Sequence, residues 1–218
     1  MTCARNTVFA LSAATLLTGA ASANVLQNAG FEAGTGADAA DWAEIVGGPS
    51  GSVGRSSLMP NTGAFSAYMQ FDHINNPTAG GAYFIEQVQP VGSIDPSLNY
   101  DLSFFAKMDS MDFTGMDAFV QILWLDQDAS NGGGVQGEML TSLVGLGIGT
   151  EYQQFSFDGM DVPDGADSFL LRFQLSAGAV DNIANGLYID DASLTAVPAP
   201  ASAALLALGA LTGARRRR

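Results

Sequence analysis

Cysteine and histidine are nearly absent from this chain of 218 residues. The one cysteine, Cys3, stands at the extreme start, so no disulfide or thiol chemistry is expected in the rest of the chain. The one histidine, His73, lies in a turn-like stretch, and a surface position is the preferred interpretation. A Ser-His-Asp triad would depend on this single residue, and no carboxylate pair stands in a distinctive glycosidase motif. The sequence therefore does not predict an enzyme.

Basic residues are also scarce: lysine and arginine number eight, against 22 aspartates and glutamates. Five of the eight lie at the two ends, in Arg5 and a terminal arginine block. Residues 24–196 keep all 22 acids and three basic residues, a formal net charge of −19. Such a surface repels nucleic acid and anionic membranes, so no nucleic-acid partner is expected. Most of these carboxylates are interpreted as a solvated surface, typical of a secreted protein.

The first 23 residues predict a secretory signal peptide. Arg5 supplies a short positive region, and residues 8–19 form an uncharged, mostly apolar stretch. Ala21 and Ala23 supply the small residues that signal peptidase accepts, so cleavage is expected before Asn24. A buried core helix, the alternative, does not explain the basic start and the small-residue exit.

Residues 197–218 combine a structure breaker, a short apolar run and a basic end. Pro198 and Pro200 interrupt regular structure, and residues 201–214 are small and apolar. At about 1.5 Å per residue, this run is short for a transmembrane helix across a bilayer of about 30 Å. It suits a sorting signal that is held in the membrane until it is processed. The positive end, which would stay cytoplasmic, consists of Arg215, Arg216, Arg217 and Arg218.

This order of features resembles the PEP-CTERM sorting tail of Gram-negative bacteria. The resemblance covers only residues 197–218, and Ala199 replaces the usual middle glutamate, which leaves processing of the tail open. It implies a sorting transpeptidase of the exosortase type as a partner. It also implies a place in the cell envelope, on the cell surface or in the extracellular matrix. A tail helix packed on the domain is the alternative, because arginines also suit a helix C-terminus.

Residues 24–196 predict one all-β domain, an antiparallel β-sandwich of the jelly-roll type, flanked by the signal peptide and a short apolar helix. Apolar segments of strand length are separated by Gly, Asn and Asp clusters. In residues 169–176, Phe169 and every second residue after it face the core, and Arg172, Gln174 and Ser176 face outward. No sustained helical period or internal repeat is present. Expected strands are 65–71, 83–88, 100–108, 119–126, 153–157, 169–176 and 187–195.

Four segments carry a second resemblance. They are the opening residues 24–32 (NVLQNAGFE), the middle residues 100–107 (YDLSFFAK), the strand and turn of residues 153–166, and the closing residues 187–194 (LYIDDASL). In this order, with Trp42 after the opening segment, they resemble the galactose-binding-like jelly roll of carbohydrate-binding modules that accompany glycoside hydrolases. The resemblance spans nearly the whole domain. It is more specific to the fold than to sugar binding, because the fold carries many functions.

In that family a structural calcium ion ties the opening segment to the last strand. The resemblance implies Glu32 and Asp190 as its ligands here, with Asp191 as a further candidate. Calcium prefers oxygen ligands, and carboxylates from distant segments can share one ion. The alternative is that these are exposed carboxylates at the end of a strand.

A sugar-binding face combines aromatic rings with planar hydrogen-bonding groups. Alternation along the strands predicts one outward set of this kind on a shared concave sheet, although outward polar residues need no ligand. The set consists of Tyr68, Phe105, Lys107, Gln121, Arg172 and Gln174.

Two functions remain open. The first is an exported, non-catalytic module that binds extracellular polysaccharide. The second is a structural cell-surface protein of the same fold without a sugar ligand. Loss of Phe105, Arg172 or Gln174 should abolish sugar binding in the first case and be tolerated in the second.

Overall fold

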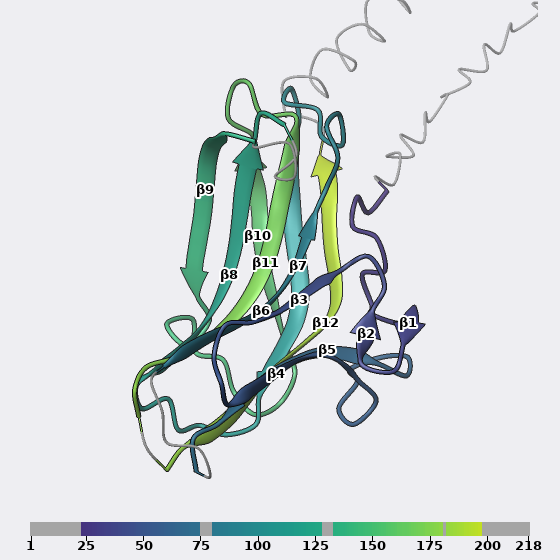
Figure 1. Ribbon diagram of the computed structural model, residues 1–218. Helices are drawn as coiled ribbons and strands as arrows, with labels where there is room; N and C mark the ends of the chain where they lie inside the picture. The colour runs from purple at the N-terminus through teal and green to yellow at the C-terminus, as the bar shows by residue number, and fades with distance from the viewer. Residues whose placement is uncertain (1–22, 75–79, 128–132, 181, 198–218) are drawn as a thin grey trace, which may run out of the picture.

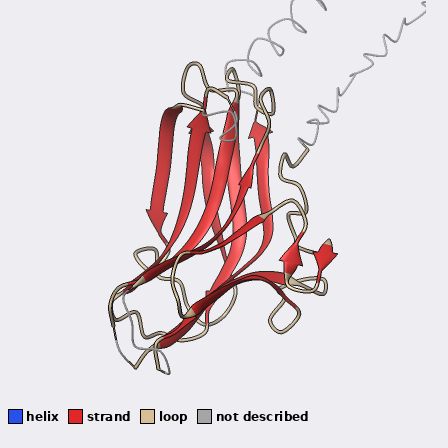
Figure 2. Ribbon diagram, viewed as in Figure 1, coloured by secondary structure: helices blue, strands red, loops and turns tan. Residues whose placement is uncertain are grey.

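The computed structural model describes residues 23–74, 80–127, 133–180 and 182–197. All regular structure in these ranges is β-strand (Figure 2). Within them no helix is long and apolar enough to cross a membrane. The predicted signal peptide up to Ala21 and the predicted sorting tail, from Pro198 and Pro200 to the arginine block, lie outside the described residues.

Two antiparallel five-stranded sheets pack against each other (Figure 1), which confirms the predicted β-sandwich. The β12 sheet contains, in order, β10 (Gln153–Asp161), β7 (Asn99–Met108), β12 (Ala184–Val197), β5 (Ser66–Asp72) and β4 (Gly51–Ser56). The β11 sheet contains, in order, β3 (Ala43–Val46), β6 (Gly81–Val88), β11 (Ser168–Ala177), β8 (Met116–Leu125) and β9 (Val135–Ser142). A two-stranded ribbon, β1 (Gly34–Thr35) with β2 (Asp38–Ala39), stands beside them.

The core lies between the facing sheets and follows the predicted alternation. In β11, Phe169 and each second residue to Leu175 are fully buried, as are Leu102 to Met108 at the same spacing in β7. The sheets meet where Phe104 of β7 packs edge-on against Phe173 of β11, with ring centroids 4.8 Å apart. Full burial of a side chain of this size contributes about 1.5–3 kcal/mol.

The opening segment runs beside the last strand. Asn24 forms a β-bridge with Thr195, and the amide of Val25 donates to the carbonyl of Leu194 at 2.9 Å. Trp42 is buried against Phe31, with ring centroids 5.0 Å apart. The two ends of the domain are therefore adjacent, as a shared calcium site requires.

Two expectations need correction. His73 is not a surface residue: it is fully buried, its ring packs on Phe71, and its Nδ1 lies 2.9 Å from the carbonyl oxygen of Val180. The carbonyl of Ile183, just before β12, accepts the backbone amide of His73 at 2.8 Å, so this part of the chain packs beside the histidine. In addition, β1, β2, β3, β4 and β9 were not among the expected strands, because these short segments lack a clear apolar alternation.

Candidate functional site

The six residues predicted to form one sugar-binding face lie on two different sheets, so the prediction of a single face is wrong. Tyr68 lies on β5 and Phe105 and Lys107 on β7, all on the outer face of the β12 sheet. The other three, Gln121 on β8 and Arg172 and Gln174 on β11, lie on the outer face of the β11 sheet. Alternation tells which residues face outward, but it does not tell which sheet a strand joins.

The outer face of the β11 sheet carries a hydrogen-bonded polar row centred on Arg172. Its guanidinium bonds to Glu86 through Nε and Nη2, at 2.8 and 2.6 Å, and donates to Oε1 of Gln121 at 3.2 Å. Gln121 in turn donates to Glu138 at 2.7 Å. The row crosses β6, β11, β8 and β9, and charge-assisted bonds hold its planar groups in fixed positions. We call it the Arg172 row.

Aromatic side chains lie beside the Arg172 row. Gln174 stands between Phe84 on β6 and Phe119 on β8 in the strand register. The guanidinium carbon of Arg172 lies 4.3 Å from the centroid of the Phe84 ring. All these side chains are half-buried, so the surface is open to solvent. Half-exposed rings next to fixed amide groups can stack against a sugar ring and bond to its hydroxyl groups.

The outer face of the β12 sheet carries a row of tyrosines. Tyr188 of β12 stands between Tyr68 and Lys107 in the register, and Tyr152 lies on the far side of Lys107. The ammonium group of Lys107 is 5.8 Å from the Tyr188 ring centroid and 5.9 Å from that of Tyr152. Burial raises the pKa of both Tyr152 and Tyr188, so both phenols stay protonated at neutral pH. We call Tyr68, Tyr188, Lys107 and Tyr152 together the tyrosine row.

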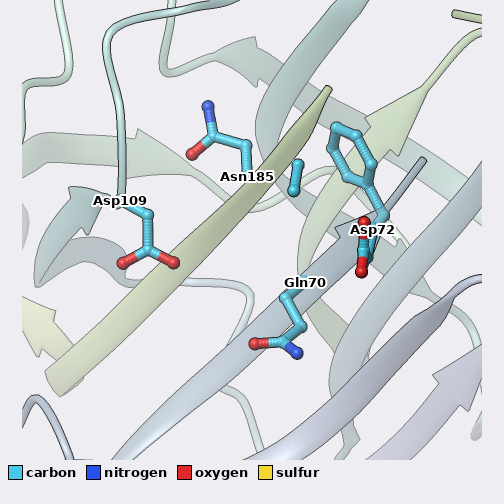
Figure 3. Close-up of a pocket in the computed structure, with 6 residues that line it drawn as sticks. Gln70, Asp72, Asp109 and Asn185 are labelled. Carbon is cyan, nitrogen blue, oxygen red and sulfur yellow. The ribbon is translucent and has the colours of Figure 1, made fainter. Parts of the chain in front are cut away.

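A cavity of about 230 Å³ has Gln70 and Asp109 on its lining (Figure 3), which follow Tyr68 and Lys107 of the tyrosine row by two positions each. Its lining residues are Gln70, Phe71, Asp72, Asp109, Ala184 and Asn185. Gly186 pairs with Gln70 across the strands, and a Cβ atom on this glycine would come within 2.5 Å of the Asp109 carboxylate. Burial raises the pKa of Asp109, an effect that nearby Lys107 opposes.

The three predicted calcium ligands come together around the loop of residues 61–65. Asp190 Oδ2 accepts the amides of Asn61 and Thr62 at 2.8 and 3.1 Å, and Glu32 Oε1 accepts two further loop amides. Asp191 accepts hydrogen bonds from the side chains of Asn61 and Thr62. Neighbouring residues of a regular strand point to opposite faces, but a register shift in β12 at this point, where Asp191 has a φ of 49°, directs both aspartates to one loop.

These carboxylates therefore bind loop amides and side-chain donors in the structure. Burial and the charge of Asp191 raise the pKa of Asp190 to about 6, against the effect of the amides that it accepts. Among the described residues, no group of three His, Cys, Asp or Glu side chains is arranged to hold a metal ion. Carboxylate oxygens remain the ligand type that calcium prefers, so the calcium site stays a prediction.

Sequence reasoning missed Arg55. Its side chain is buried and donates to the backbone carbonyls of Glu32, Gly34 and Gly36 at 2.8, 2.7 and 3.1 Å. The ring of Phe65 covers the guanidinium at 4.0 Å. The only available signal was that Arg55 is one of three basic residues in a strongly acidic domain.

No protein-family model and no curated protein sequence matches the chain. Solved structures do match. The enzymatically active domain of bacteriophage CBA120 tailspike protein 4 is similar with a TM-score of 0.57 and 19% identity, over 80% of this chain and 21% of that chain. TmCBM61 in complex with beta-1,4-galactotriose is similar with a TM-score of 0.50 and 15% identity, over 81% of this chain and 100% of that chain.

An α-L-arabinofuranosidase, MgGH51 in its arabinose-bound form, is similar with a TM-score of 0.50 and 16% identity, over 80% of this chain and 26% of that chain. The chain thus spans about a fifth to a quarter of the two matched enzymes and a whole carbohydrate-binding module. At these identities the likeness concerns the fold alone: the chain shares the β-sandwich architecture of these domains.

Proposed function

We propose that this protein is an exported, non-catalytic module that binds a neutral extracellular polysaccharide through the outer face of the β11 sheet. The observation that carries the proposal is the Arg172 row with Phe84 and Phe119 beside it. Stacking on the rings would orient a sugar unit, and Gln121 and Gln174 would bond to its hydroxyl groups. The complex of TmCBM61, a module of the same fold, with beta-1,4-galactotriose supports this choice of ligand class.

Charge favours a neutral polysaccharide over an acidic one. The domain has a formal net charge of −19, and the guanidinium of Arg172 is already paired with Glu86. A polyanion would meet like charge here without a free cation to offset it. Glu86 and Glu138 both take part in the row, which is not the apolar surrounding that the acid of a glycosidase needs.

We extend the proposal to the location of the protein on the strength of the two ends of the sequence. A signal peptide would export the chain, and the PEP-CTERM-like tail would hold it in the membrane until a sorting transpeptidase of the exosortase type acts on it. The protein would then present its polysaccharide site at the cell envelope, on the cell surface or in the extracellular matrix.

Affinity electrophoresis of the full-length protein tests the sugar site. The gels contain one of four neutral polysaccharides, namely β-1,4-galactan, xylan, a β-glucan or mannan. We expect retardation in at least one gel, and each of Gln121→Ala and Gln174→Ala should weaken binding about five- to tenfold. This estimate takes about 1 kcal/mol for each lost hydrogen bond. Gln136→Ala, which removes an exposed glutamine from edge strand β9, is the matched control.

A structural surface protein without a sugar ligand is the alternative, and one observation favours it. The charged and amide groups of the Arg172 row already satisfy one another, so the row can exist without a ligand. This alternative predicts no retardation in any gel. Retardation that is the same for the wild-type protein and both glutamine variants would place the sugar site elsewhere.

A further inference from the structure

The outer face of the β12 sheet carries a second surface with the features of a sugar site. We propose that Tyr68, Gln70, Lys107, Asp109 and Tyr188 bind a second neutral polysaccharide chain, so that one sandwich bridges two chains. This inference rests on the proposed function, because it assigns the same ligand class to the opposite face. It turns a simple binding module into a cross-linker.

The tyrosine row supplies the aromatic part of this second site. Tyr68 is half-buried and open to solvent, whereas Tyr188 beside it is only 6% exposed and forms a rigid floor. The hydroxyl of Tyr152 donates to the carbonyl of Met59 at 2.6 Å, which fixes the far end of the row. A sugar ring would therefore stack on the exposed part of Tyr68, with the buried Tyr188 packed beside it.

The cavity beside the row supplies the polar part. Gln70 lies two residues from Tyr68 on β5, and Asp109 follows Lys107 by two residues at the end of β7. Both side chains line the cavity of about 230 Å³ (Figure 3), and Gly186, the register partner of Gln70, places no side chain between them. This volume is below the roughly 300–1,000 Å³ of pockets that enclose a whole drug-sized ligand. It suits one projecting sugar unit of a chain that lies along the sheet.

The chemistry of the lining selects a neutral, hydroxyl-rich occupant. The Asp109 carboxylate accepts hydrogen bonds, and the Gln70 amide both donates and accepts, a combination that matches sugar hydroxyl groups. The one cation, Lys107, already lies against two tyrosine rings. A polyanion would meet Asp109 and the negative charge of the whole domain. The surface is largely polar, so it offers a protein partner little apolar area to bury.

The two proposed sites face away from each other. The inner faces of the two sheets share one core, and packed sheets lie about 10 Å apart. One extended polysaccharide chain therefore cannot contact both outer faces at once. Occupation of both sites by separate chains makes a bridge.

A capture assay tests this bridge. Beads that carry the polysaccharide bound most tightly in the affinity gels are loaded with the full-length protein, washed, and exposed to the same polysaccharide with a fluorophore. The wild-type protein should capture the soluble chain. The double variant Tyr68→Ala/Gln70→Ala should stay on the beads but capture at least tenfold less, and so should Gln121→Ala/Gln174→Ala. A variant with all four substitutions should not bind the beads.

Gln136→Ala should capture as the wild-type protein does, and Gln70→Ala alone, an exposed position, covers the case in which loss of Tyr68 disturbs folding. The second site is overturned if both Tyr68→Ala/Gln70→Ala and Gln70→Ala capture as much soluble polysaccharide as the wild-type protein. It is also overturned if Gln121→Ala/Gln174→Ala no longer binds the beads at all. Wild-type protein that binds beads without capture also overturns it and leaves the proposed function intact. Wild-type protein that binds none of the four polysaccharides overturns both.

Discussion

Replacement of Arg55 by alanine should destabilise the domain more than loss of any other basic residue in it. Three backbone carbonyls of residues 32–36 would lose their donors, and Phe65 would lose the guanidinium that it covers. Because this segment is partly exposed, water can reach some of the carbonyls, and about 1 kcal/mol for each is appropriate. With about 0.5–1 kcal/mol for the cation–π contact, the expected loss is about 3–4 kcal/mol.

Urea unfolding of the full-length protein, followed by tryptophan fluorescence, measures this loss as a shift of the midpoint at constant slope. Arg55→Lys should recover only part of it, because an ammonium group cannot bond three carbonyls in a fixed fork. Arg172→Ala is the matched control: its partly exposed ion pair with Glu86 should contribute about 1 kcal/mol or less. If Arg55→Ala costs no more than Arg172→Ala, the argument from the three carbonyls is wrong.

Four further predictions concern the acidic loop and the two ends of the chain. In the presence of a chelator, the melting temperature should fall as pH rises from 5 to 7. The pKa of Asp190 is about 6 in the folded protein, against an ordinary 3.8, so the fold favours the protonated carboxyl group. Asp190→Asn should flatten this dependence, and a flat wild-type curve would contradict the prediction. At pH 7, calcium at a hundred times its dissociation constant should add about 2.7 kcal/mol of stability, and Glu32→Gln should remove the response in thermal unfolding; an insensitive wild-type protein would exclude the site. Mass spectrometry of exported protein should find Asn24 as its first residue. Deletion of residues 197–218 should leave a cooperatively folding β-protein, and aggregation of this variant would instead indicate that the tail is part of the core.

The sequence alone was sufficient to predict which strand residues point into the core. Every second residue from Phe169 to Leu175 and from Leu102 to Met108 is fully buried because each strand has one face in the core, so a period of two identifies this set, although it does not identify Leu170, which is also buried. The adjacency of Glu32 and Asp190 was also predictable, but from the family resemblance alone, since the two are far apart in the chain. The structure explains it through the pairing of the opening segment with β12.

The grouping of outward residues was not predictable from alternation. Consecutive strands β7 and β8 belong to different sheets, and this crossing separates Lys107 from Gln121 by the thickness of the sandwich. Local sequence carries no record of such a crossing. Burial of His73 and Arg55 depends in the same way on distant segments that pack beside them. Tyr152 was missed because it precedes β10, outside the predicted strand of residues 153–157.

The position of β12 in its sheet has a mechanical consequence. This strand ends at Val197, next to the predicted sorting tail, and it lies between β7 and β5 rather than at an edge. A force applied at Val197 acts along the strand, and the hydrogen bonds to β7 over residues 187–197 and to β5 over residues 184–189 lie across that direction. They must therefore break together in shear, whereas an edge strand can peel off one bond at a time. A cell-surface protein tethered at this point would carry load on the central strand of its sheet.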